Sequence, residues 1–205
     1  MTIATVEPSV FLACGIPQEP VLPLAVEQYH EMIRAGILEN GAPAELLEGW
    51  LVRKMTKDPP HTLSLGCTFD ALSAVVGRDW HVRKEDPVTT DDSEPEPDVS
   101  VVRGRRRDYA ERHPGPEEVG LLVEVAEASL NRDRGWKKRI YAAARIPVYW
   151  IVNLVDRQVE AFTGPSGPRP RPDYAASQVY LPGQEIPVLL AGQEVGRIAV
   201  DDLLP

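Results

Sequence analysis

The sequence is most constrained by the run VGLLVEVA at 119–126, in which Glu124 is the one charged residue. A run this apolar and this rich in Val and Leu is typical of a strand that is covered on both faces of a sheet. Side chains alternate along a strand, so we expect Leu122, Glu124 and Ala126 to share one face. A carboxylate on such a strand loses its hydration and needs a compensating positive charge. An arginine or a divalent cation could supply that charge.

The segments around this strand predict an alternation of helices and short strands. Helices are expected at 24–36, 61–77 and 131–145, where apolar residues recur every three or four positions. Strands are expected at 81–85, 97–102, 147–153 and 157–163, with a hairpin around Gly49 and shorter strands near the C-terminus. This order predicts an α/β or α+β fold, with a mixed β-sheet flanked by helices.

The length of 205 residues suits a single hydrophobic core. Residues 1–23 contain four prolines and are expected to form an irregular N-terminal arm, which leaves 24–205 as a single domain. The arm has no early Lys or Arg and makes a poor secretory signal, and no apolar run reaches the length that spans a bilayer. Cys14 and Cys67 show no zinc or disulfide spacing. We therefore expect a cytoplasmic protein without a membrane partner.

The net charge of −9 argues against strong non-specific binding to nucleic acid, which relies on neutralised phosphates. It does not exclude a local basic groove, because the net charge does not show how the charged residues are distributed over the surface. The cluster of Arg103, Arg105, Arg106 and Arg107 follows an acidic stretch directly. This cluster could hold a nucleic-acid backbone, or it could be a solvated loop.

Asp98 is a second acid in a strand-like apolar context, within PDVSVV at 97–102. For either acid alone, an ordinary structural role with a basic partner is the better interpretation. Two such acids that converge would instead suit Mg²⁺ or Mn²⁺, which prefer oxygen ligands.

On the helix expected at 131–145, Asp133, Lys137 and Tyr141 recur at every fourth position and so lie on one face. Asp133 and Lys137 could be an ordinary surface pair. Alternatively, Lys137 could aim a positive charge at the two acids. Lys138 points about 100° away around the helix and is the weaker candidate.

These strings together resemble the Uma-two family of putative restriction endonucleases, which belongs to the PD-(D/E)XK nuclease superfamily. The resemblance rests on EPDVSVV, LLVEVAEAS and DRGWKKRIYAAARIPVYWIVN, with AELLEGWLV and the Pro-Pro-His of 59–61 before them, and it spans about residues 24–162. It implies a restriction-endonuclease-like fold with Asp98 and Glu124 as metal ligands. In the superfamily, a lysine follows the second acid by two residues, and that position is Ala126 here. The resemblance to the family implies that Lys137, on the next helix, takes the place of this lysine.

The resemblance also implies an acid in the hairpin, where Glu45 and Glu48 are both candidates. They lie on opposite faces of the strand, so one of them should face the site, and we favour Glu45. His61 could contact substrate or water, but a lone histidine after two prolines is more often a residue of the helix start.

The function implied is metal-assisted hydrolysis of phosphodiester bonds in nucleic acid, with DNA as the expected substrate. Asp98 and Glu124 would hold Mg²⁺ or Mn²⁺, with Lys137 and Glu45 completing the catalytic set. Glu127-Ala128-Ser129 replaces the family's Ser-Pro-Ser, which favours an alternative, a catalytically inactive nuclease-fold interaction domain that is dimeric. Strands such as 147–153 could form the interface of such a homodimer.

Overall fold

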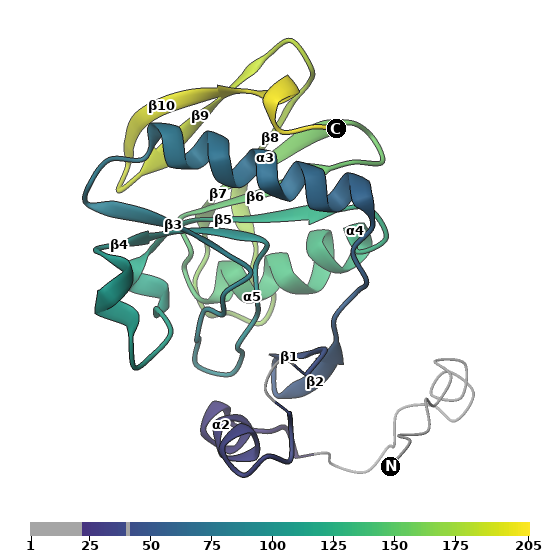
Figure 1. Cartoon of the computed structure of the whole chain (residues 1–205), viewed down its shortest axis with the longest axis vertical. Coiled ribbons are helices and arrows are strands. Elements are labelled where there is room, and N and C mark those ends of the chain that lie inside the picture. Colours follow the sequence, from purple (N-terminus) through teal and green to yellow (C-terminus); the bar gives the residue numbers. More distant parts are fainter. Residues whose placement is uncertain (1–21, 40–41) are drawn as a thin grey trace.

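The computed structural model describes residues 22–39 and 42–205 (Figure 1). Its centre is a six-stranded sheet with the order β3-β4-β5-β6-β7-β8. In that order the strands are Trp80–Lys84, Val99–Arg103, Val119–Ala126, Val148–Asn153, Gln158–Pro165 and Tyr174–Tyr180. β5 and β6 pair in parallel and the other neighbours pair antiparallel, so the sheet is mixed, as predicted.

β5 lies inside this sheet, and all of its residues are buried. The two faces of the strand contribute to different cores: Val123 and Val125 belong to one, and Leu122 and Ala126 to the other. The predicted alternation is therefore confirmed, and Glu124 falls on the face that carries Leu122 and Ala126.

Each face of the sheet is covered by other elements (Figure 1). On one face lie α3, Pro59–Val75, and the hairpin of β9, Glu185–Leu190, with β10, Gln193–Ala199. On the other face lie α4, Leu130–Arg132, and α5, Lys138–Ala143. Short 3-10 turns occur at η1, Arg106–Tyr109, at η2, Pro116–Glu118, and at η4, Val200–Asp202. The predicted fold class is thus confirmed.

The start of α3 is set by Asp58, whose side chain accepts a hydrogen bond from the backbone N–H of His61 at 3.1 Å. Pro59 and Pro60 occupy the first helical positions, where a missing N–H breaks no helical hydrogen bond. His61 is therefore a helix-start residue, as expected, and it is also fixed at the end of α3 that lies nearest the candidate site.

The helix predicted at 131–145 is interrupted. A π-helical turn, η3, spans Asp133–Lys137 between α4 and α5. Gly135 lies at its middle, and glycine weakens a regular α-helix. Asp133 and Lys137 are 1% and 3% exposed, so the surface-pair interpretation is wrong. The sequence predicts the shared face of these residues but not the turn, which is a feature often found at functional sites.

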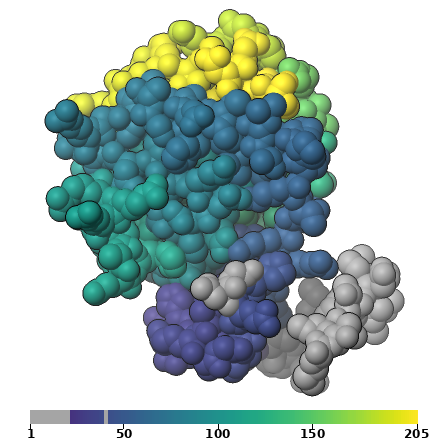
Figure 2. All heavy atoms as spheres, in the orientation of Figure 1, coloured from purple at the N-terminus to yellow at the C-terminus, as the bar shows by residue number. Residues whose placement is uncertain are grey.

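The N-terminal part of the fold is α2, Val26–Arg34, packed on a hairpin of β1, Ala44–Leu47, and β2, Trp50–Arg53. Figure 2 shows this purple and blue unit at one end of the molecule. The hairpin turns through Glu48 and Gly49, at φ 48° and 79°, the left-handed pair that favours a two-residue turn. A bridge between Leu46 and Glu94 attaches the hairpin to the segment that precedes β4.

Three further expectations have different outcomes. The strand 147–153 is wrong as a dimer interface, because β6 is paired along both edges and wholly buried. The arm at 1–23 lies almost entirely outside the described residues, so the division at residue 24 stays a prediction. None of the described helices is long and apolar enough to cross a membrane.

The turn at Gly49 gives a first prediction. A Cβ at Gly49 would lie 2.3 Å from Pro23 Cβ at a left-handed φ, whereas a Cβ at Gly192, also left-handed, meets nothing within 4 Å. We expect Gly49→Ala to lower the free energy of unfolding by about 2–4 kcal/mol and Gly192→Ala by about 1–2 kcal/mol. Urea denaturation of both variants measures this, and equal losses would show that Pro23 moves aside freely.

Candidate active site

Asp98, immediately before β4, and Glu124, in β5, lie side by side. β4 and β5 pair Val99 with Val123 and Ser100 with Leu122. One position further along this register, Asp98 lies opposite Glu124, on the same face of the sheet. The two acids are 7% and 4% exposed. Two carboxylates that are distant in sequence are thus brought to one end of the central strand.

Asp98 is surrounded by hydrogen-bond donors. Its Oδ2 accepts from the Val125 backbone N–H at 2.8 Å and lies 3.2 Å from His61 Nε2. Its Oδ1 lies 3.2 Å from Lys57 Nζ. Burial alone would raise the pKa of Asp98, but His61, Lys57 and the Val125 N–H together lower it below its ordinary value. Asp98 is therefore ionised at neutral pH.

Glu124 is held through a single oxygen. Lys137 Nζ and the Tyr141 hydroxyl both donate to its Oε1, at 2.9 and 2.6 Å. No donor from the described part of the chain contacts its Oε2, which leaves that oxygen for a ligand. Burial raises the pKa of Glu124 to about 8, although Lys137 opposes this shift.

Lys137 links Glu124 to the hairpin acid Glu45, whose Oε2 lies 3.3 Å from Lys137 Nζ. Glu45 also accepts from the Glu96 backbone N–H at 3.2 Å, and its Oε1 lies 3.7 Å from the Arg132 guanidinium. Burial alone would lower the pKa of Lys137, but Glu124 and Glu45 raise it above its ordinary value. Lys137 therefore keeps its charge inside the protein.

Of the two hairpin acids, Glu45 is the one that reaches the site. Glu48 lies at the turn, where it accepts from Trp136 Nε1 at 2.8 Å and pairs with Arg139. Lys138 also points elsewhere, to Asp173 at 3.0 Å. Sequence reasoning thus chose the residues that the fold brings together: Glu45, Asp98, Glu124 and Lys137.

These four residues line one pocket of about 360 Å³. Its lining holds five carboxylates, four basic side chains and one histidine: Glu45, Glu85, Glu96, Asp98 and Glu124; Lys54, Lys57, Arg132 and Lys137; and His61. Each carboxylate has a basic partner in the chain. The pocket is therefore strongly charged but nearly neutral as a whole.

Sequence reasoning missed Lys57, Glu85 and Arg132, and it weighed His61 toward a structural role alone. Lys57 lies between β2 and α3 in a segment without regular structure, where no periodic pattern points to it. Glu85 has a left-handed φ of 56° at the end of β3, and its N–H donates to the Asp98 carbonyl at 3.0 Å. Among these residues, only His61 had a sequence signal for its position, namely its place directly after Pro59 and Pro60.

The arginine cluster at 103–107 lies away from this pocket. Asp98 immediately precedes β4 and Arg103 ends it, so the cluster begins at the opposite end of the strand. Arg103 lies over the Trp80 ring at 4.6 Å, and Arg105 pairs with Asp108 at 3.1 Å. None of the four arginines lines the pocket. Whether the cluster holds a nucleic-acid backbone or is a solvated loop stays a prediction.

The pocket fits a hard divalent cation held by few protein ligands. Within residues 22–39 and 42–205, no group of three or more His, Cys, Asp or Glu side chains is arranged to hold a metal ion. Mg²⁺, however, is usually bound by one or two carboxylates together with waters and substrate phosphate. Asp98 and the open Oε2 of Glu124 supply such a pair.

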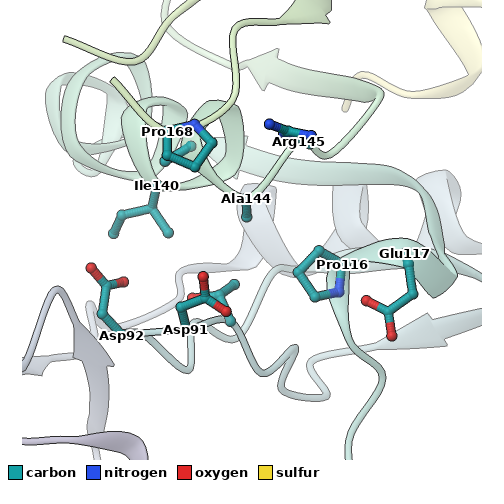
Figure 3. Close-up of a pocket in the computed structure, with 10 residues that line it drawn as sticks. Asp91, Asp92, Pro116, Glu117, Ile140, Ala144, Arg145 and Pro168 are labelled. Carbon is teal, nitrogen blue, oxygen red and sulfur yellow. The ribbon is translucent and has the colours of Figure 1, made fainter. Parts of the chain in front are cut away.

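Another hollow, of about 520 Å³, lacks this chemistry. Figure 3 shows it, with Asp91, Asp92, Glu117 and Arg145 among the residues that line it. It shares no lining residue with the pocket around Asp98 and Glu124. Its acids come from surface loops rather than from buried strands, so it does not compete as a catalytic site.

Comparisons with known proteins give the family and the fold. The family model described as Uma2, putative restriction endonuclease, matches residues 26–200. The chain is also similar to the crystal structure of a putative nuclease belonging to DUF820 from Anabaena variabilis ATCC 29413, with a TM-score of 0.64 and 16% sequence identity. That match covers 88% of this chain and 97% of the other, and at this identity it shows a shared fold. No curated protein matches the chain.

The raised pKa of Glu124 gives a second prediction. Between the ordinary value of 4.5 and about 8, the folded protein binds a proton at Glu124 that the unfolded chain releases. The stability from this group is therefore complete below pH 4.5 and is lost as the pH rises through 8. We expect the stability of Glu124→Gln, relative to wild type, to increase by on the order of 2–4 kcal/mol from pH 5 to pH 9.

Urea denaturation at pH 5, 7 and 9 measures this change. The control is Glu111→Gln, because Glu111 is exposed on a surface loop and should show no such trend. A constant offset of Glu124→Gln from wild type reflects the altered contact with Lys137. A difference that does not change with pH would contradict the raised pKa.

Proposed function

Because the chain belongs to the Uma2 family of putative restriction endonucleases, we propose that it is a metal-dependent endonuclease that hydrolyses phosphodiester bonds in nucleic acid. The observation that carries the proposal is the pairing of Asp98 with Glu124 at the end of the central strand, with Lys137 bound to Glu124. Family membership gives the class of protein, and the pocket gives the chemistry. DNA is the proposed substrate, as the family description suggests.

Asp98 and Glu124 would hold Mg²⁺ or Mn²⁺. Asp98 is already ionised, and Glu124 offers Oε2 once its proton leaves. A divalent ion held there would supply Lewis-acid chemistry, which activates water and offsets the charge that develops on a phosphate. Because the pKa of Glu124 is raised to about 8, we expect the site to bind cations better at pH 8 than at pH 6.

The proposed role of Lys137 is to position Glu124 and to keep a positive charge in the site. Its ammonium fixes Oε1 of Glu124 and remains positively charged between Glu124 and Glu45. A fixed charge in a buried site needs little reorganisation when negative charge develops nearby. Arg132 and Lys57 also line the pocket and are the basic groups proposed to contact phosphate oxygens.

Binding of nucleic acid is expected to be weak without the cation. The acids and basic groups of the pocket nearly balance, but the whole chain carries a net charge of −9. A polyanion is therefore repelled by the protein as a whole until divalent ions reduce this negative charge. Affinity for DNA should increase with added Mg²⁺.

One observation favours a second candidate function, a catalytically inactive interaction domain that is dimeric. Every carboxylate of the pocket has a basic partner in the chain, so the site is neutralised without a metal ion. This candidate predicts no Mn²⁺ binding by calorimetry and a dimer by light scattering. The nuclease proposal predicts Mn²⁺ binding that requires Asp98.

The proposal is tested with Asp98→Asn, which keeps the size of the side chain and removes its charge. We expect cleavage of plasmid DNA in Mg²⁺ or Mn²⁺ to fall at least about a hundredfold, because one of two metal ligands is weakened. The matched control is Asp70→Asn on the exposed face of α3, which should cleave like the wild type.

Two results would contradict the proposal. Cleavage that persists in Asp98→Asn would remove the assigned site, while a nuclease elsewhere in the molecule could still exist. A wild-type protein that neither binds Mn²⁺ nor cleaves DNA or RNA would instead support the inactive interaction domain.

A further inference from the structure

Lys57 occupies a position that bears directly on cation binding. Its ammonium contacts both Asp98, at 3.2 Å from Oδ1, and Glu85. Its side chain is 37% exposed, against 12% for His61, the other side chain that contacts the Asp98 carboxylate, whereas Asp98 itself is almost buried. The contact therefore lies at the mouth of the pocket, between solvent and the acid.

The two oxygens of Asp98 differ in what they can still accept. Oδ2 already accepts the Val125 N–H and lies near His61. Oδ1 is the oxygen that faces Lys57. A divalent cation on Oδ1 would lie within a few ångströms of the ammonium, and like charges at that distance repel strongly in a partly buried site. The two cations therefore compete for Oδ1.

We propose that Lys57 is a tethered counter-ion that competes with the divalent cation for Asp98, so that metal binding requires exchange of one cation for the other. This inference rests on the proposed metal site and adds a means of regulating it. While Lys57 holds Asp98, the acid stays ionised in a buried position. When the divalent cation replaces it, the ammonium is released at the edge of the same pocket.

The local structure allows this exchange without unfolding. Residues 54–58 join β2 to α3 without helix or strand structure, so the Lys57 side chain can rotate while the backbone stays in place. Asp58, the next residue, caps α3 and fixes where the segment ends. Glu85 lies at the end of β3 beside Asp98 and can keep the released ammonium near the pocket.

Lys54 provides a matched control within the same segment. It also lines the pocket, but it pairs with Glu96 at 2.6 Å and not with Asp98. Removing Lys54 changes the charge of the pocket by the same amount as removing Lys57. A general effect of charge would therefore appear in both variants, whereas competition for Asp98 would appear in the Lys57 variant alone.

The first experiment measures Mn²⁺ affinity by calorimetry for the full chain at one pH. We expect Lys57→Ala to bind Mn²⁺ about three- to fivefold more tightly than the wild type, the range expected when a partly exposed ion pair no longer competes. Lys54→Ala should stay within about twofold of the wild type. Tight binding by Lys57→Ala where the wild type binds too weakly to detect would also support the proposal.

The second experiment uses the wild-type protein and so does not depend on how a variant folds. Acylation of lysines by an N-hydroxysuccinimide ester, followed by peptide mass spectrometry, reports how free each ammonium is. Adding Mg²⁺ should increase the labelling rate of Lys57 several-fold and leave that of Lys54 unchanged.

The outcomes separate this inference from the proposed function. If the wild type binds Mn²⁺ but Lys57→Ala binds it equally or more weakly, and Mg²⁺ leaves Lys57 labelling unchanged, the exchange is wrong and the metal site stands. If neither the wild type nor Lys57→Ala binds Mn²⁺, the metal site itself is wrong and the exchange falls with it.

Discussion

A carboxylate on the central buried strand is the constraint around which the rest of this structure is organised. Ionising Glu124 inside the sheet is costly, and the group that opposes this cost, Lys137, comes from the helical segment that follows β5. Lys137 in turn needs more negative charge than one acid supplies, and Glu45 of the hairpin provides it. Helix, strand and hairpin are thus joined by one buried chain of charges.

The same chain of charges accounts for the irregular features near it. The π-helical turn ends at Lys137, where the ammonium must reach inward to β5. Glu48, in the hairpin turn, accepts a hydrogen bond from Trp136 and forms an ion pair with Arg139, both in the adjoining helical segment. Local helix and turn preferences are overridden where the electrostatic requirement is strongest, as expected at functional sites.

Much of the fold could be predicted from the sequence because its elements follow local patterns. The apolar run of β5, the Glu-Gly turn of the hairpin and the prolines that begin α3 each carry their own signal. The resemblance to a family supplied what local patterns could not, namely that Asp98, Glu124 and Lys137 belong together. Lys57 and Arg132 were missed because their roles come from tertiary proximity alone. The arginine cluster lies at the far end of β4 from the pocket, and its contact with nucleic acid stays a prediction.

The hairpin has a consequence for how this fold can tolerate insertions. Its register sets which side chains of β1 face inward, and the turn that fixes the register has only Glu48 and Gly49. One additional residue there would shift the pairing by a single position and exchange the two faces of the strand. Leu46 would then be presented where Glu45 now meets Lys137. Length variation among relatives should therefore fall outside this turn.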